Sequence, residues 1–232
     1  GSDTVTLKDW FLGGDNVVDS ITFASGGSIS SDQIFGAFGL SNPDPVGSPD
    51  YQGLPDERSY ANLVAGNAAA HTILGSSDAD FIDAGAGDDT LEGGLANDYL
   101  IGGDGSDTYL VGVGAGQDII NNFSNTATSD TDVLEFLADI DESNLWFTRD
   151  GDNLVVDVIG SDDQVTIQGW YTDSSQQLDE IRTSDAVLQA NMVDNLVSAM
   201  ATFGAPPAGD AQLTQDVRDQ VDPVIAANWQ AA

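Results

Sequence analysis

The 232-residue chain carries 39 acidic residues against 5 basic ones, which gives a formal net charge of −34. Phosphate groups are bound by Lys and Arg, so this balance excludes nucleic acid as a partner. The chain has no cysteine, which excludes disulfides and thiolate metal sites, and no run of 18 apolar residues, which predicts that it has no membrane span.

The first segment contains one copy of an internal repeat. Residues 3–23 match residues 163–183 after a shift of 160 positions without a gap, and a Trp is among the matched residues. The six identical pairs are Asp3/Asp163, Val5/Val165, Thr6/Thr166, Trp10/Trp170, Asp19/Asp179 and Ile21/Ile181. We therefore interpret residues 1–25 as the tail of a preceding module of the same kind as the one that follows.

Residues 26–65 are poorly patterned and contain Pro43, Pro45, Pro49 and Pro55 among Ser, Asp and Gly. This composition predicts a spacer with little regular structure. Its acids are interpreted as solvated loop charges rather than as metal ligands. A short helix over residues 60–70 is expected to cover the next segment.

Four nine-residue units occupy residues 75–110. Each unit begins with small residues, has Asp at position six and has a large apolar residue at position eight. The acids are Asp80, Asp89, Asp98 and Asp107, and the apolar residues are Ile82, Leu91, Leu100 and Tyr109. A disordered Gly/Asp-rich linker would not keep large apolar residues in register, so the pattern favours a repeating fold.

The spacing predicts how the units stack. A short strand points the position-eight side chain inward, and the small residues before it suit a tight turn. Two units complete one coil, so turns 18 residues apart lie on the same side: Asp80 with Asp98, and Asp89 with Asp107. Carboxylates stacked at strand spacing of about 4.8 Å repel one another unless a cation lies between them. Ca²⁺ fits, because it accepts carboxylate and carbonyl oxygens together.

The repeat pattern becomes irregular at both ends. Residues 66–74 keep the register, with Ile73 inward, but His71 replaces the acid. Downstream, a unit with two extra residues brings Asp118 and Ile120 into the acid and inward positions, so Asp118 is expected to close a third site with Asp98. Residues 66–121 hold nine Asp and one Glu without any Lys or Arg, which predicts a segment that folds when metal binds.

Residues 122–184 show five strand-like runs separated by turn residues: 133–136, 145–148, 154–158, 165–168 and 178–182. They predict an antiparallel, β-rich cap over the exposed sheet edge. Trp146 and Trp170 are interpreted as core residues rather than as a ligand platform.

Residues 185–232 carry two helical patterns. Apolar residues recur at helical spacing over residues 186–203, and a second pattern spans residues 214–229 with Pro223 interrupting or restarting it.

The nine-residue unit resembles the GGxGxDxUx repeat of the RTX (repeats-in-toxin) hemolysin-type calcium-binding proteins. Trp146-Phe147-x-Arg149-Asp150-Gly151 and Val165-Thr166-Ile167-x-x-Trp170 resemble the domain that flanks such repeats. The resemblance implies an all-β-dominated fold: a right-handed parallel β-roll over residues 66–121, a β-rich flank and C-terminal helices. It also implies backbone ligands for two Ca²⁺ ions, with room for three or four. These carbonyl-bearing residues are Gly75, Ser77, Ala84, Gly85, Ala86, Gly87, Gly93, Gly94, Leu95, Ala96, Gly102, Gly103 and Gly105.

The resemblance further implies a secreted or cell-surface protein that is exported by a type I secretion machinery through an uncleaved signal in its carboxy-terminal segment. Simple packing helices account equally well for the pattern over residues 186–203. No zinc-protease HExxH, lipase Gly-x-Ser-x-Gly or phosphate-binding loop is present, so the chain is predicted not to be an enzyme. The alternative function is a module of a surface adhesin that binds a glycan or a protein through Phe35, Phe38 and Tyr51.

Overall fold

The computed structural model describes residues 20–22, 28–30, 60, 62–124, 130–172, 174–204, 206 and 212–232. Most of the first repeat copy (residues 3–23) and most of the spacer (residues 26–65) lie outside these residues.

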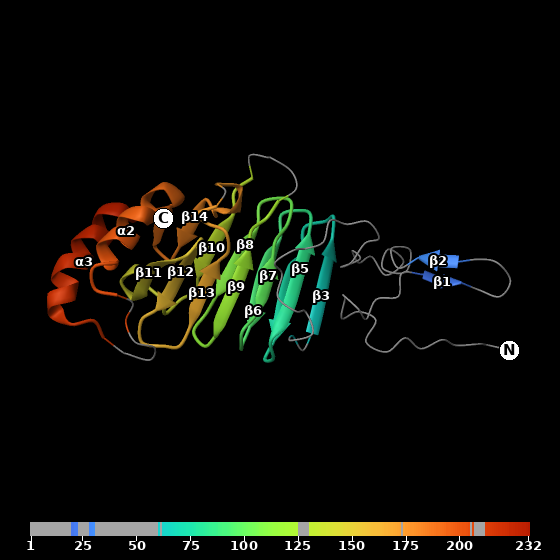
Figure 1. The fold of residues 1–232 in the computed structure, drawn as a ribbon, viewed down its shortest axis with the longest axis horizontal. Helices are drawn as coiled ribbons and strands as arrows, with labels where there is room; N and C mark the ends of the chain where they lie inside the picture. The colour runs from blue at the N-terminus through green and yellow to red at the C-terminus, as the bar shows by residue number, and fades with distance from the viewer. Residues whose placement is uncertain are drawn as a thin grey trace.

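The repeats form a parallel β-roll in which the chain alternates between two sheets (Figure 1). One sheet takes β3 (Asn62–Asn67), β5 (Asp80–Gly85), β7 (Tyr99–Ile101) and β9 (Gln117–Asn121). The other takes β4 (Thr72–Ser76), β6 (Thr90–Gly94), β8 (Thr108–Val111) and β10 (Val133–Phe136). Ile82 pairs with Leu100, and Leu91 pairs with Tyr109. The predicted stacking at 18-residue intervals is confirmed.

The position-eight side chains form the centre of the roll. Ile82, Leu91, Leu100 and Tyr109 are each 0% exposed and belong to one core cluster. Their neighbours in β6 and β8 alternate between half-buried and buried, as expected when successive side chains point to opposite faces of a strand. One large apolar residue in every nine is therefore enough to define the inside of each coil.

The strands after the repeats extend both sheets. β10 pairs in parallel with β8 and with β14 (Glu180–Arg182), and β13 (Gln164–Ile167) pairs in parallel with β9. The prediction of an antiparallel cap is wrong where the flank joins the roll, because β10, β13 and β14 run in the same direction as the coils before them. Antiparallel pairing begins only farther out, with β11 (Leu145–Asp150), β12 (Asn153–Val158), β15 (Ala186–Gln189) and β16 (Gln230–Ala231).

Two helices close the carboxy-terminal end: α2 (Val193–Met200) and α3 (Gln215–Asn228). Leu196 of α2 and Ile225 of α3 belong to the same core cluster as the roll, so the helices are part of the folded core. α3 continues through Pro223, which neither ends nor restarts it. Short 3₁₀ segments, η4 (Glu142–Asn144), η5 (Ser174–Gln176) and η6 (Ala190–Met192), connect the remaining elements.

Two predicted helical segments are strands in the structure. Residues 62–67 form β3, which pairs with β5, instead of a helix over residues 60–70. Residues 186–189 form β15 before α2 begins, because Leu188 pairs with Ile181 of β14 and is buried there. In both places, pairing with a neighbouring strand overrides the local pattern.

The internal repeat has a structural counterpart. β1 (Ser20–Thr22) pairs antiparallel with β2 (Ser28–Ser30), with Ile21 opposite Ile29. β14, which is the copy of β1 after the shift of 160 residues, pairs antiparallel with β15. In both copies, therefore, the last strand of the repeat pairs antiparallel with the strand that follows it.

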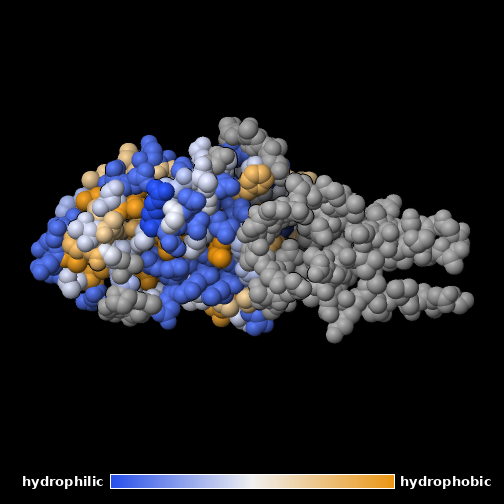
Figure 2. Space-filling view, viewed as in Figure 1, coloured by the Kyte–Doolittle hydropathy of each residue, from blue (hydrophilic) through white to orange (hydrophobic). Residues whose placement is uncertain are grey.

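On the face seen in Figure 2, hydrophilic residues predominate over the middle of the molecule, and hydrophobic patches gather toward the helical end. The large apolar side chains most exposed among the described residues are Leu74, Leu95, Val113 and Phe123. No helix in the described part of the chain is long and apolar enough to cross a membrane.

Candidate metal centre

The position-six carboxylates form two ladders along the roll, one on each side. In the first ladder, the backbone N–H of Asp80 donates to Asp98 Oδ1 (2.8 Å), and that of Asp98 donates to Asp118 Oδ1 (3.0 Å). In the second ladder, the N–H of Asp89 donates to Asp107 Oδ1 (3.0 Å), and that of Asp107 donates to Oδ1 of Asp132 (2.9 Å). Each carboxylate thus fixes the backbone of the turn before it and is fixed in position by that bond.

Three of these carboxylates have a second oxygen without a partner. Asp89, Asp98 and Asp107 are at most 1% exposed, and their Oδ2 atoms have no hydrogen-bond partner. A buried acceptor without a donor is costly, and more so when it belongs to an ionised group. Residues 62–124 contain no Lys or Arg that supplies the missing charge.

The turns that carry these acids require backbone conformations that most residues avoid. Positions two and four have positive φ in the second to fourth units, for example +101° at Gly103 and +127° at Gly105. Ala96 takes the same conformation at +77°, although it has a Cβ. The turns are therefore built alike, and small residues at these positions let the chain take this shape.

The first unit differs from the other three. Neither Ser76 nor Asp78 has positive φ, and Ser76 donates its backbone N–H to Asp80 Oδ2 (2.5 Å) and its hydroxyl to Asp80 Oδ1 (3.2 Å). The side-chain amide of Asn62 also donates to Asp80 Oδ1. Both carboxylate oxygens of Asp80 already have protein donors, so this turn has less capacity for a cation.

Burial raises the pKa of several ladder acids, Asp98, Asp107 and Asp118 among them. It raises the pKa of Asp98 to about 6, and that of Asp107 and Asp118 to about 7, while the hydrogen bond from the preceding turn partly opposes each shift. The charge of Asp132 raises the pKa of Asp107 further, and the charge of Asp98 does so for Asp118. The ladders therefore hold ionised carboxylates at a cost that a bound cation would remove.

Each potential site needs backbone ligands in addition to carboxylates. Among the described residues, no point brings together three or more His, Cys, Asp or Glu side chains that could hold a metal. A pair of stacked carboxylates supplies two oxygen donors, and the turns beside them carry backbone carbonyls. Such an oxygen-only set with few charges suits Ca²⁺, which accepts six to eight oxygens, better than Zn²⁺.

In the structure, the sequence-predicted acids lie next to one another in the pairs that the length of the coil predicts. Asp80 contacts Asp98, Asp89 contacts Asp107 and Asp98 contacts Asp118. At the upstream end of the second ladder, His71 stands in the acid position, with Nδ1 3.1 Å from Asp89 Oδ1. The assignment of these acids and of the turn carbonyls as calcium ligands stays a prediction.

Sequence reasoning missed two members of the second ladder. Asp132 follows Asp107, and the N–H of Asp132 donates in turn to Asp179 Oδ2 (2.9 Å). The gaps between these three residues are 25 and 47 residues, so no nine-residue spacing marks them. The match of Asp19 to Asp179 in the internal repeat is the one sequence signal that singled out Asp179.

Gly102 gives a steric test of the turn. A Cβ at this position would lie 2.2 Å from Asp107 Oδ2, whereas one at Gly112 would lie 3.5 Å from its nearest neighbour, Leu137 Cδ1. Gly102→Ala is expected to destabilise the calcium-bound fold by about 1–3 kcal/mol through overpacking. Gly112→Ala is the matched control and should cost less than about 1 kcal/mol. Urea unfolding in calcium measures both, and equal effects would show that the turn at Gly102 is not tightly packed.

Two family models match the chain. The RTX calcium-binding nonapeptide repeat, in four copies, matches residues 74–109. The haemolysin-type calcium binding protein related domain matches residues 1–33 and 153–188, which include the two copies of the internal repeat. Both models describe calcium-binding proteins, not enzymes.

A comparison with solved structures finds the extracellular lipase LipA from Serratia marcescens, with 25% sequence identity and a TM-score of 0.27. The match covers 49% of this chain and 20% of the lipase chain, so it spans about a fifth of that protein. The family models and the parallel β-roll show that the chain carries RTX hemolysin-type calcium-binding repeats between two stretches that match the related domain.

Proposed function

We propose that this chain is a calcium-responsive module of a secreted protein, which folds and is held folded by Ca²⁺ outside the cell. The observation that carries the proposal is the set of buried Oδ2 atoms of Asp89, Asp98 and Asp107, which have no protein donor. A divalent cation would satisfy these atoms and neutralise the ladders. With the cation bound, the carboxylates stabilise the folded coil, whereas without it their burial and mutual repulsion oppose folding.

The strongest site lies between Asp89 and Asp107, because both carboxylates have an unpaired oxygen. On the other side, Asp98 is shared between its neighbours Asp80 and Asp118. We infer that it holds an ion mainly with Asp118, because the oxygens of Asp80 accept hydrogen bonds from Ser76. Carbonyls of the turns over residues 84–89, 93–98 and 102–107 complete the ligand set.

Calcium dependence suits an exported protein. Weak extracellular-type sites bind with dissociation constants of about 10⁻⁴–10⁻³ M, so they stay empty in the cytosol. Self-repulsion of the acidic chain then keeps it loose enough to be threaded through an exporter. Outside the cell, binding stabilises the folded state by mass action.

The first expected result is that chelator largely unfolds the isolated chain, and that millimolar Ca²⁺ restores its β-structure. Far-ultraviolet circular dichroism with and without EDTA measures this change. Mg²⁺ is the matched control and should restore little, because it demands near-octahedral geometry at about 2.0–2.1 Å. Identical spectra of a folded chain in EDTA and in Ca²⁺ would rule the proposal out.

We also propose that residues 185–232 carry the export information for a type I secretion machinery. Since Leu196 and Ile225 pack in the core, the exporter would read this segment before the chain folds. Residues 185–232 fused to a slow-folding passenger are expected to support its secretion by a cognate exporter, whereas a fusion of residues 130–184 should not. Retention of both fusions inside the cell would contradict this role.

The alternative function, binding of a cell-surface glycan or protein, depends on Phe35, Phe38 and Tyr51. These residues lie outside those that the structure describes, and no contact among the described residues favours this function over the calcium-responsive one.

A further inference from the structure

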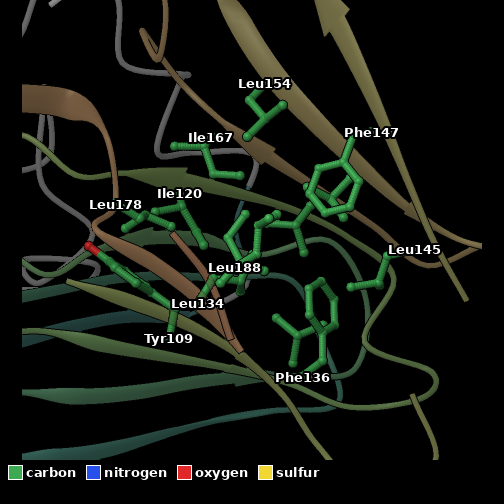
Figure 3. Close-up of a cluster of buried hydrophobic side chains, with 14 of the residues drawn as sticks. Tyr109, Ile120, Leu134, Phe136, Leu145, Phe147, Leu154, Ile167, Leu178 and Leu188 are labelled. Carbon is green, nitrogen blue, oxygen red and sulfur yellow. The ribbon is translucent and has the colours of Figure 1, made fainter. Parts of the chain in front are cut away.

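Tyr109 differs from the other inward-facing residues of the repeats because its side chain ends in a hydroxyl. The equivalent residues Ile82, Leu91 and Leu100 are purely apolar. Figure 3 shows Tyr109 at one edge of the core cluster, with its hydroxyl oxygen at the outer end of the ring. Tyr109 is 0% exposed, so the hydroxyl needs partners within the protein.

Those partners connect the last calcium turn to the flank. The backbone N–H of Gly102 donates to Tyr109 Oη (2.9 Å), and Tyr109 Oη donates to Asn122 Oδ1 (2.9 Å). Asn122 Nδ2 then donates to Asp132 Oδ2 (2.8 Å). Gly102 begins the turn that ends at Asp107, and Asp132 leads into β10. A continuous chain of hydrogen bonds therefore runs from the turn to the first strand after the repeats.

Asn122 supplies Oδ2 of Asp132 with the hydrogen-bond donor that three acids of the repeats lack. Oδ2 of Asp89, Asp98 and Asp107 lacks a donor, whereas Oδ2 of Asp132 has the buried amide of Asn122, which is 3% exposed. Oδ1 of Asp132 accepts from the next N–H along the ladder, in the same way as the other acids. The second ladder thus continues past the repeats. At Asp132 an amide donates to Oδ2, whereas the Oδ2 atoms of the earlier turns have no donor.

We propose that Asn122 replaces a calcium ion at Asp132, and that the Tyr109–Asn122 link makes the flank fold in response to calcium bound at the Gly102–Asp107 turn. This inference rests on the proposed function, because it takes calcium as the ligand of that turn. β10 and β14 then need no ion of their own. An ion that fixes the turn also fixes Gly102, and through Tyr109 and Asn122 it fixes the position of Asp132.

The test compares calcium binding with folding of the flank. Residues 62–124 contain no Trp, and Trp146, Trp170 and Trp229 are buried after the repeats, so in a chain with Trp10→Phe the tryptophan fluorescence reports folding of the flank and the helices that pack on it. Calorimetric titration with Ca²⁺ reports binding. In the unaltered chain, the two midpoints are expected to coincide. In Tyr109→Phe, the fluorescence midpoint should move to about fivefold to tenfold more Ca²⁺ than the binding midpoint, because two buried hydrogen bonds are lost.

Tyr99→Phe is the matched control. The hydroxyl of Tyr99 also has two partners, Gln168 Oε1 (2.6 Å) and Asn121 Nδ2 (3.1 Å), but it does not contact a calcium turn. This variant should keep the two midpoints together. A double-mutant cycle adds Asn122→Ala: the variant with both Tyr109→Phe and Asn122→Ala should shift no further than the larger single change, since both break one chain of bonds.

Coincident midpoints in Tyr109→Phe, or additive shifts in the double variant, would overturn the link. An unaltered chain that neither binds Ca²⁺ nor changes fluorescence would instead overturn the proposed function itself. The two failures are therefore distinguishable in the same set of titrations.

Discussion

Replacing Asp98 by alanine is expected to raise the Ca²⁺ concentration needed for half-maximal folding by on the order of tenfold or more. Asp98 lies between Asp80 and Asp118 in the first ladder, so its carboxylate adjoins two turns. Its Oδ2 is buried without a donor, so the substitution removes a carboxylate oxygen that has no other partner in the protein. Calcium titrations followed by circular dichroism measure the midpoint, and calorimetry measures the number of ions bound.

Asp80→Ala is the matched control, because it removes the same group from the end of the same ladder. The carboxylate of Asp80 is held by Ser76 and Asn62, so its loss should leave the number of bound ions unchanged and shift the midpoint by only a fewfold. Equal losses of affinity in the two variants would mean that the turns do not share ions along the ladder.

Lowering the pH from 8.0 to 5.5 is expected to weaken calcium binding strongly. Burial raises the pKa of Asp107 and Asp118 to about 7 and that of Asp98 to about 6, so binding an ion must displace protons at the lower pH. Each such proton costs about tenfold in affinity per pH unit below the pKa. Calorimetry at both pH values, in buffers of different ionisation enthalpy, measures the affinity and the protons released.

The calcium-free chain should respond to pH in the opposite direction. These acids have a higher pKa in the folded state than their unfolded value of about 3.9, so the folded state binds more protons. Their stabilising contribution is complete below the unfolded pKa and is lost as the pH rises through about 6 to 7. In EDTA, circular dichroism should therefore show more structure at pH 5 than at pH 8. Equal spectra at the two pH values would contradict the burial of these acids.

The repeats were predictable because one nine-residue rule sets every coil. A single apolar residue at position eight defines the inside, and small residues at positions two and four permit the turn. β10, for which residues 133–136 were predicted, has the same bounds in the structure. The stacking of Asp89 on Asp107 followed from spacing alone, since the period of the coil fixes which turns are neighbours.

The parts that could not be predicted depend on contacts between distant segments. β3 forms because residues 62–67 pair with β5, and the sequence marks this strand only by Val64, which lies nine residues before Ile73 without an acid or a glycine-rich turn of the repeat type before it. The outward face of the same sheet carries Phe81 stacked on Tyr99 with centroids 5.2 Å apart, which the inward-facing pattern of the repeats does not signal. Asp132 joins the second ladder after an irregular connection, so its role appears only in three dimensions.

The most direct test of the central claim is anomalous X-ray diffraction from crystals grown in Ca²⁺. We predict anomalous peaks between the stacked turns, beside the Oδ2 atoms of Asp89, Asp98 and Asp107, and none beside Asp132, where Asn122 supplies the donor. Ordered, stacked turns without any peak at these three carboxylates would contradict the account.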